Sequence, residues 1–293
     1  MGKYSIKELE RLSGIKAHTL RIWEKRHQLI EPERTGTNIR FYSDDDLKKI
    51  INVSLLNNNG IKISKIANLS NDELRKRVVE LSETKDQTNI FIDQMVMAMI
   101  DMEEEQFENL LSKLTLKFGF ERTITEIIYP FLEKIGVLWQ TGNISPAQEH
   151  FISHLVRQKI IVAIDSLPLA PKTAKRVLLF TPENELHELG LLFYHFLAKK
   201  EGFRTYYLGQ SVPYADLRSV FETHRPRVII GSMTTVPQPK DVQGYIDQMS
   251  ADFAGAVILA SGSAVRKVAL KFPSNFHIFD NSLRLKELLL SLR

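Results

Sequence analysis

A histidine and a glutamate two residues apart stand where a parallel sheet would place a binding site. Glu185 and His187 follow the apolar segment RVLLF, which has the length and composition of a buried strand. The loop after such a strand lies at the carboxyl edge of the sheet, where open α/β folds bind their ligands. An imidazole at this edge can bind a metal or a ligand, or it can be an ordinary loop histidine.

A second group of polar and aromatic residues lies earlier, in the segment WQTGNISPAQEH. Trp139 is followed after nine residues by Glu149 and His150. Ser145 and Pro146 are typical of a helix start, which places Glu149 and His150 one turn into a new helix. Trp139 taken alone could be a core residue of a helical bundle. His150 and His154 have the spacing of a helical zinc pair, but no third ligand is evident.

The surrounding pattern predicts three domains. Short apolar runs alternate with helical patterns after the Pro-containing junction SLPLAPKTAKR, which indicates a flavodoxin-like (Rossmann-type) parallel sheet. The stretch before the junction has helical apolar periodicity throughout, as in a four-helix bundle. The predicted boundaries are 1–75 for a winged-helix head, 80–168 for the four-helix bundle and 174–293 for the α/β domain.

The head has the order of a winged helix-turn-helix. SIKELERLSGI predicts a helix capped by Ser5 and ended at Gly14, and KAHTLRIWEKRH predicts a second helix. The segment ERTGTNIRFYS then reads as a β-hairpin wing, and Ser43 opens another helix. In this motif the second helix enters the major groove of DNA.

Charge and composition agree with a DNA-binding head on a neutral body. Residues 1–80 hold 16 Lys and Arg against 11 Asp and Glu, whereas the rest of the chain holds 23 against 24. The absence of cysteine excludes disulfides and thiol chemistry. We find no signal peptide and no apolar run of the roughly 18 residues that a membrane helix needs. We therefore expect a cytoplasmic protein that has no contact with a membrane.

The segment TLRIWEKRHQLIEPERTGTNIRFYSDDDLKKI resembles the winged-helix head of the MerR family. The resemblance covers about residues 4–70, with several spaced elements in the same order. It implies double-stranded DNA, at a promoter or operator, as the partner. The residues that it implies in DNA contact are Arg21, Trp23, Arg40 and Tyr42. His18 and Arg26 are further candidates for DNA contact, with solvated surface residues as the alternative. The two aromatic residues, Trp23 and Tyr42, could instead be packing residues.

The two chemical motifs resemble those of cobalamin proteins. Glu-x-His-x-x-Gly at Glu185 resembles the Asp-x-His-x-x-Gly signature of cobalamin-binding domains. Trp-x(9)-Glu-His at Trp139 resembles the helical cap of the CarH/LitR-like light-sensing repressors, which join a MerR head to adenosylcobalamin. The order of head, cap and sheet also agrees, so the resemblance covers nearly the whole chain.

This resemblance implies a role for each residue. His187 would bind the cobalt as the lower axial ligand, and Glu185 would accept the N–H of its ring. Trp139, Glu149 and His150 would face the adenosyl group from the cap. The residues expected to accommodate the nucleotide tail of the cofactor are Gly190, Ser232 and Thr234. Gly262, after the fourth strand, is expected to permit the close approach of either this tail or the protein backbone.

The sequence departs from the cobalamin pattern at three positions. Glu185 replaces the usual Asp, and Ser261-Gly262 replaces a Gly-Gly pair. Gln140 stands where some relatives have a histidine that could bind cobalt after the adenosyl group leaves. These changes leave open how the tail packs and which ligand the cobalt has after illumination.

Together these observations and the family resemblance predict a DNA-binding regulator, a repressor, that is gated by adenosylcobalamin and light and assembles as a dimer or tetramer. One alternative is a regulator of the same architecture with an empty pocket or another ligand. An alternative from another class is a corrinoid enzyme subunit, for methyl transfer or as part of a mutase. The DNA-binding head argues against an enzyme, and we assign no catalytic residues.

Overall fold

The computed structural model describes residues 3–36, 38–84, 88–140, 144–234, 242–266 and 270–293, and some side chains near the gaps are not described. The chain divides into two compact units, Met1–Leu155 and Val156–Arg293, and each is considered by itself. The further separation of the first unit into a head and a cap remains a prediction. None of the described helices is both long enough and apolar enough to cross a membrane.

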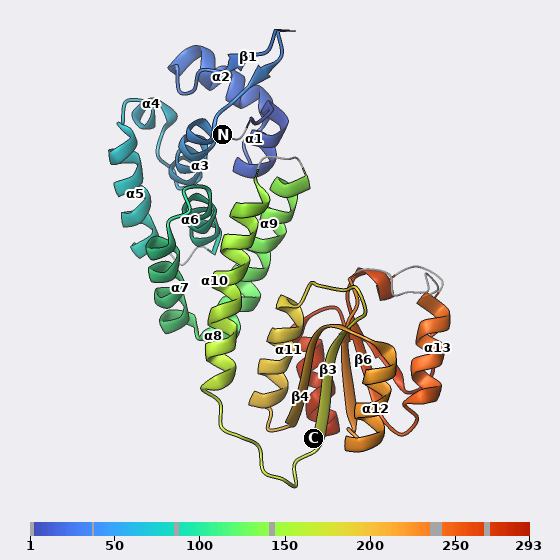
Figure 1. Cartoon of the computed structure of the whole chain (residues 1–293). Coiled ribbons are helices and arrows are strands. Elements are labelled where there is room, and N and C mark those ends of the chain that lie inside the picture. The colour runs from blue at the N-terminus through green and yellow to red at the C-terminus, as the bar shows by residue number, and fades with distance from the viewer. Residues whose placement is uncertain (1–2, 37, 85–87, 141–143, 235–241, 267–269) are drawn as a thin grey trace. The chain divides into compact units, whose positions relative to one another are not determined.

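The first unit begins with the predicted winged helix-turn-helix (Figure 1). Ser5 caps the first helix in a capping box with Glu8, and Gly14 ends it with a left-handed backbone at φ 74°. The wing is an antiparallel pair in which Glu33 lies opposite Phe41. The elements are α1 (Ile6–Ser13), α2 (Ala17–His27), β1 (Glu33–Arg34), β2 (Arg40–Phe41), α3 (Asp44–Asn58) and α4 (Ile63–Ile66).

The remainder of the first unit is helical. α3 contacts α1, α5 and α6, so it joins the head to the helices that follow. Pro130 lacks an N–H and cannot continue the regular helical ladder, and a π-helical turn, Ile124–Ile128, lies just before it. The helices are α5 (Asn71–Thr84), α6 (Thr88–Ile100), α7 (Glu104–Phe118), α8 (Phe120–Thr123), α9 (Tyr129–Gln140) and α10 (Pro146–Asp165), the last of which runs into the second unit.

The second unit is a five-stranded parallel sheet in the order β4-β3-β5-β6-β7. This is the flavodoxin-like order, as predicted. The strands are β3 (Arg176–Pro182), β4 (Arg204–Val212), β5 (Val228–Ser232), β6 (Val257–Ser261) and β7 (Phe276–Ile278). The helices are α11 (Leu189–Lys200), α12 (Tyr214–His224), α13 (Val242–Asp252), α14 (Ser282–Leu292) and a 3-10 turn at Ser263–Arg266.

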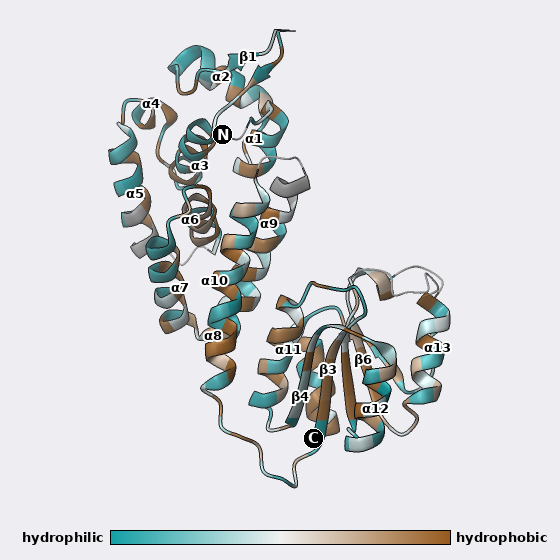
Figure 2. Ribbon diagram, viewed as in Figure 1, coloured by the Kyte–Doolittle hydropathy of each residue, from teal (hydrophilic) through white to brown (hydrophobic). Residues whose placement is uncertain are grey.

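Helices cover both faces of this sheet. Leu178, Ile229 and Ile258 pack with apolar residues of α12 and α13, whereas α11 contacts α14 together with β3 and β5. Figure 2 shows β3 and β6 as almost uniformly hydrophobic, as expected for strands that are buried on both faces. The connection after β3 leads to β4 on one side, whereas the connection after β5 leads to β6 on the other side. Open α/β folds bind their ligands in a crevice at such a reversal, which here corresponds to the loops that follow β3 and β5.

Gly262 is required by the way two backbones approach each other after β5 and β6. Its φ is 106°, and a Cβ atom there would lie 2.2 Å from the carbonyl oxygen of Met233. The same Met233 donates its N–H to Ser261 O at 2.7 Å and accepts from Ala264 N at 3.0 Å. The predicted close approach at Gly262 is therefore to protein backbone.

We expect Gly262→Ala to destabilise the second unit by more than about 2 kcal/mol, because an L side chain is strained at this φ and also forces the two loops apart. Gly255→Ala is the matched control, since Gly255 has φ 90° with nothing within 4 Å of a Cβ atom. Urea unfolding monitored by circular dichroism would compare them. Equal losses for the two variants would show that the close contact with Met233 contributes nothing.

Candidate functional site

A buried carboxylate organises the loop between β3 and α11. Glu185 is only 1% exposed. Its Oε1 accepts hydrogen bonds from the backbone N of His187 at 2.9 Å and from His187 Nδ1 at 2.6 Å. Its Oε2 accepts from the backbone N of Thr234 at 2.9 Å, in the loop that follows β5. One side chain therefore ties together the two loops that flank the crevice of the sheet.

This arrangement fixes the His187 ring in a form that can bind a metal. A carboxylate oxygen accepts this hydrogen bond, so Nδ1 carries a proton, and in the neutral imidazole Nε2 then presents its lone pair. The His187 side chain is 71% exposed, although its partner is buried. A histidine with one nitrogen held by a carboxylate and the other accessible is the usual form of a metal-ligating imidazole. The donor set therefore fits a cobalt ligand.

The backbone of Glu185 is fixed as firmly as its side chain. The buried hydroxyl of Thr181 donates to the carbonyl oxygen of Glu185 at 2.6 Å. The backbone N of Ser211, at the end of β4, donates to the same carbonyl oxygen at 3.2 Å. These bonds hold the loop onto the ends of two strands, so the position of His187 is set by the sheet.

A second carboxylate in this loop was not singled out by the sequence. Glu188 is buried and accepts from Arg157 Nε at 2.5 Å and from the Tyr207 hydroxyl at 3.0 Å. Burial, with Glu188 adding to it, raises the pKa of Tyr207 far above its ordinary value, so this tyrosine stays protonated. Arg157 comes from the last part of α10. No local signal links Arg157 to Glu188, because they are 31 residues apart and on different elements.

The residues predicted to hold the nucleotide tail lie in two environments. Ser232 is buried at the end of β5, and Thr234 is exposed two residues later. Gly190 faces the Tyr194 hydroxyl at ordinary contact distance, since a Cβ atom there would lie 3.6 Å away. The protein alone would thus tolerate a larger residue at 190. A glycine here leaves space beside the loop of His187.

The cap residues Glu149 and His150 lie near the start of α10, where Glu149 is partly buried and His150 is exposed. His150 Nδ1 lies 3.5 Å from Glu149 Oε2, and the side chains are 67% and 39% exposed, respectively. Ser145 caps this helix as predicted, and Pro146 is its first residue. The side chain of Trp139 lies outside the described residues. No group of three potential metal ligands occurs among the described residues, so the His150 and His154 pair has no zinc site there.

The exposed face of α2 is strongly basic. Residues at spacings of three and four share this face and are all exposed: His18, Arg21, Ile22, Lys25 and Arg26. Arg40 on the wing strand lies beside it, and a hollow of about 440 Å³ is lined by Arg21, Ile22, Glu24, Lys25 and Arg40. Cations from the helix and the wing therefore converge on one surface. Such a surface suits the phosphates of DNA.

The structure corrects two of the predicted DNA contacts. Trp23 is only 7% exposed and Tyr42 is fully buried, so both are packing residues of the head. The Tyr42 hydroxyl donates to Glu24 Oε2 at 3.2 Å, and burial together with this carboxylate raises the pKa of Tyr42 to about 12. Arg40 Nε lies 3.6 Å from the other oxygen of Glu24. These aromatic residues support the basic surface from beneath.

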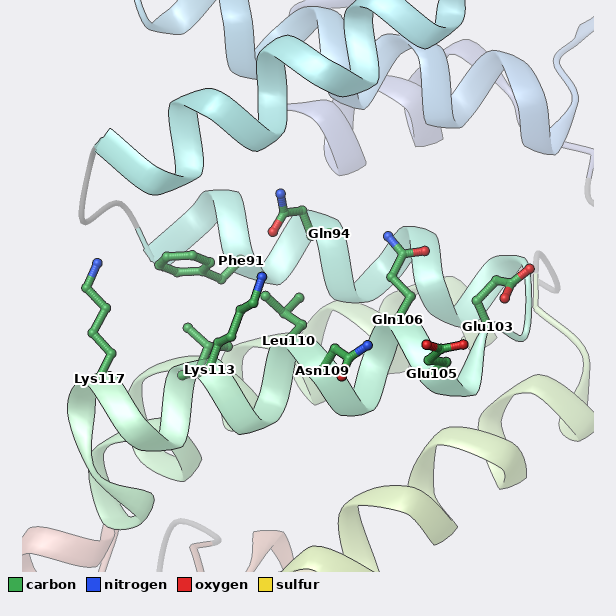
Figure 3. A pocket seen from close by; sticks show the side chains of 10 residues that line it. Phe91, Gln94, Glu103, Glu105, Gln106, Asn109, Leu110, Lys113 and Lys117 are labelled. Atoms are coloured by element: carbon green, nitrogen blue, oxygen red, sulfur yellow. The ribbon is translucent and has the colours of Figure 1, made fainter.

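The first unit has a cavity of its own, whereas Glu185 and His187 belong to the second unit. The cavity has about 550 Å³ and lies along α6 and α7, with Phe91 at one end and Glu103 at the other (Figure 3). None of the predicted cofactor residues is among the described residues that line it. The candidate site is therefore identified by the chemistry of Glu185 and His187.

Comparison with known proteins assigns two domains in the chain. Residues 4–73 match the protein family described as "MerR HTH family regulatory protein", and residues 91–163 match the family described as "B12 binding domain". The HTH-type transcriptional repressor CarH of Myxococcus xanthus is 25% identical over 270 residues, which is 90% of each chain. The repressor CarA of the same organism is 25% identical over 89% of this chain and 87% of its own.

The fold also resembles that of a solved corrinoid protein. The monomethylamine corrinoid protein of Methanosarcina barkeri aligns with 71% of this chain and 100% of its own, with a TM-score of 0.58 and 14% identity. At this identity the likeness concerns the fold alone. The chain thus joins a MerR helix-turn-helix domain to a B12-binding domain and is homologous to the CarH and CarA transcriptional repressors.

Proposed function

We propose that this protein is a transcriptional repressor whose binding to DNA is controlled by adenosylcobalamin and reversed by light. The observation that carries the proposal is the His187 ring, whose Nδ1 is held by buried Glu185 and whose other nitrogen is accessible, in a chain with a MerR-type head. The homologous repressors CarH and CarA support the regulatory role.

In this proposal His187 Nε2 would hold the cobalt. Glu185 keeps the ring in one tautomer and one orientation, and its contact with the Thr234 amide holds the neighbouring loop in place. Gly190, Ser232 and Thr234 accommodate the nucleotide tail. The cofactor, when bound, supplies a cobalt–carbon bond that light can break.

The cap would supply the residues that sense the adenosyl group. Trp139 would face this group, and Glu149 and His150 would offer it polar partners. Loss of that group changes the contacts available to the cap, and only such a difference in contacts can shift the equilibrium between two states. The loaded protein is a DNA-binding dimer or tetramer, and illumination dissociates it.

A corrinoid-carrying enzyme subunit would share the fold of the second unit, as the corrinoid protein of Methanosarcina shows. The head distinguishes the two classes. A basic face on α2 beside the cationic wing has a use in a regulator and none in methyl transfer. We therefore propose that the protein is not an enzyme.

The cobalt ligand can be tested by absorbance. We expect His187→Ala to change the visible spectrum of the bound cofactor and to weaken its binding, because the axial imidazole is lost. His277→Ala is the matched control, since His277 is an exposed histidine on β7. Identical spectra for the wild type and His187→Ala would exclude His187 as the ligand.

The DNA surface can be tested by the dependence of affinity on salt. We expect Arg21→Ala and Arg40→Ala each to lower the slope of log affinity against log salt by about one unit, with equal effects on all DNA sequences, because both are assigned to phosphates. Arg122→Ala, which removes an exposed arginine of the helical part, should leave the slope unchanged. A change of preferred sequence at constant slope would mean that Arg21 and Arg40 read bases.

The light response can be tested through Trp139. We expect Trp139→Ala to bind cobalamin through His187. We expect its oligomer size and DNA affinity no longer to change on illumination, because a smaller side chain would not contact the adenosyl group and the cap could not respond to its loss. Size-exclusion chromatography in darkness and in light would measure this. A variant that still assembles in darkness and dissociates in light would remove Trp139 from the mechanism. A wild-type protein that binds adenosylcobalamin without any response to light would rule out the photoreceptor function.

A further inference from the structure

We propose that Gln148, Asp101 and Lys48 form a polar linkage that couples the cap to the DNA-binding face of the head. All of its members lie in the first unit. The inference rests on the proposed function for its biological meaning, because the signal it would carry is the state of the cap. The contacts themselves are independent of any cofactor.

The linkage starts beside the residues assigned to the adenosyl group. Gln148 directly precedes Glu149 and His150 on the first turn of α10. Its Oε1 accepts from the backbone N of Ser145 at 3.0 Å, so its side chain belongs to the cap of this helix. Its Nε2 donates to the carbonyl oxygen of Ile100 at 3.0 Å, at the end of α6. A shift of the start of α10 would therefore act directly on the end of α6.

The next residue, Asp101, connects the end of α6 to the head. Its Oδ1 lies 2.8 Å from Nζ of Lys48 on α3, and Lys48 is also 2.8 Å from Asp45 in the first turn of the same helix. The Lys48 side chain is only 14% exposed. Burial works against its charge, yet the hydrogen bonds of Asp101 and Asp45 outweigh burial and raise the pKa of Lys48 above its ordinary value.

From the first turn of α3 the polar contacts continue to the DNA-binding face. Asp44 accepts from the Tyr4 hydroxyl at 2.8 Å, and Tyr4 exchanges two backbone hydrogen bonds with Tyr42 at 2.9 and 2.8 Å. Tyr42 donates to Glu24 of α2, which also faces Arg40 of the wing. The relative position of α2 and the wing therefore depends on where the start of α3 lies.

Lys48 has an alternative set of partners, which a switch requires. Asp45 remains beside it if Asp101 moves away, so the ammonium group is not left buried and unpaired. Asn52 is one helical turn further along α3, is 4% exposed, and its Oδ1 has no hydrogen-bond partner among the described residues. Lys48, Asn52 and Asp101 line the same cavity of about 190 Å³. The lysine thus has both the room and the acceptors to exchange Asp101 for partners within its own helix.

If the Lys48–Asp101 ion pair had a purely structural role, it would be expected to stabilise the fold. A partly buried ion pair adds little net stability, because desolvation offsets the attraction. The apolar residues of α3 and α6 already form a buried core. The contribution of the ion pair is that Lys48 has two discrete states, one paired with Asp101 and one paired with acceptors of its own helix. Coupling between two sites needs an element with two such states.

The test uses the full-length protein and the variants Gln148→Ala, Lys48→Met and Asp101→Asn. Lys49→Met is the matched control, because it removes the same charge from the next position of α3. The first measurement is amide hydrogen exchange without cofactor. We expect all three linkage variants to speed exchange in residues 44–47 at the start of α3, whereas Lys49→Met does not. Unchanged exchange there in Gln148→Ala would overturn the linkage.

The second measurement is the ratio of DNA affinities with and without adenosylcobalamin in darkness, on a duplex selected from a random pool by the wild-type protein. We expect the three linkage variants to reduce the wild-type ratio toward one, whereas Lys49→Met lowers both affinities and keeps the ratio. If Lys48→Met had the same ratio of DNA affinities as the wild type, the linkage would be overturned. A ratio of one in the wild type itself would instead refute the proposed function, and hydrogen exchange would then decide on the linkage alone.

Discussion

The burial of one carboxylate is the constraint on which the candidate cofactor site depends. A carboxyl group at 1% exposure, such as that of Glu185, is tolerable only if hydrogen-bond partners surround it, because burying an unpaired polar group is very costly. The backbone and ring of His187 and the backbone of Thr234 provide those partners. The same bonds that compensate for burial also fix the tautomer of His187. They bind the loops after β3 and β5 into one unit, so the metal-binding nitrogen has a defined position.

The sheet order explains why these loops meet. β3 and β5 are neighbours, and their connections leave in opposite directions, so the crevice opens beside their carboxyl ends. Gly262 belongs to the same edge, where its backbone passes against Met233 too closely for a side chain. The glycine expected to make room for a cofactor thus already has a role in the protein itself. Any cofactor tail must fit beside this fixed backbone.

In the head, too, one carboxylate holds neighbouring elements together. Glu24 is covered by Tyr42 and faces Arg40, so α2 and the wing are held to each other beneath the basic surface. The aromatic residues of the motif act on DNA binding through this support. Their place in the motif reflects packing, and the exposed cations, such as Arg21 and Lys25, remain the groups that can reach phosphate.

The sequence by itself determined the elements and the motif chemistry. Helix caps at Ser5 and Ser145, apolar strands and the spacing of Glu185 and His187 are local, so the chain order alone predicted the winged helix, the helical segments and the flavodoxin-like sheet. Only the tertiary structure decided that Tyr42 is buried, that Thr234 contributes its backbone N–H, and which distant residues pair. Such contacts depend on how elements pack across long stretches of chain, and no periodicity or spacing in the sequence encodes them.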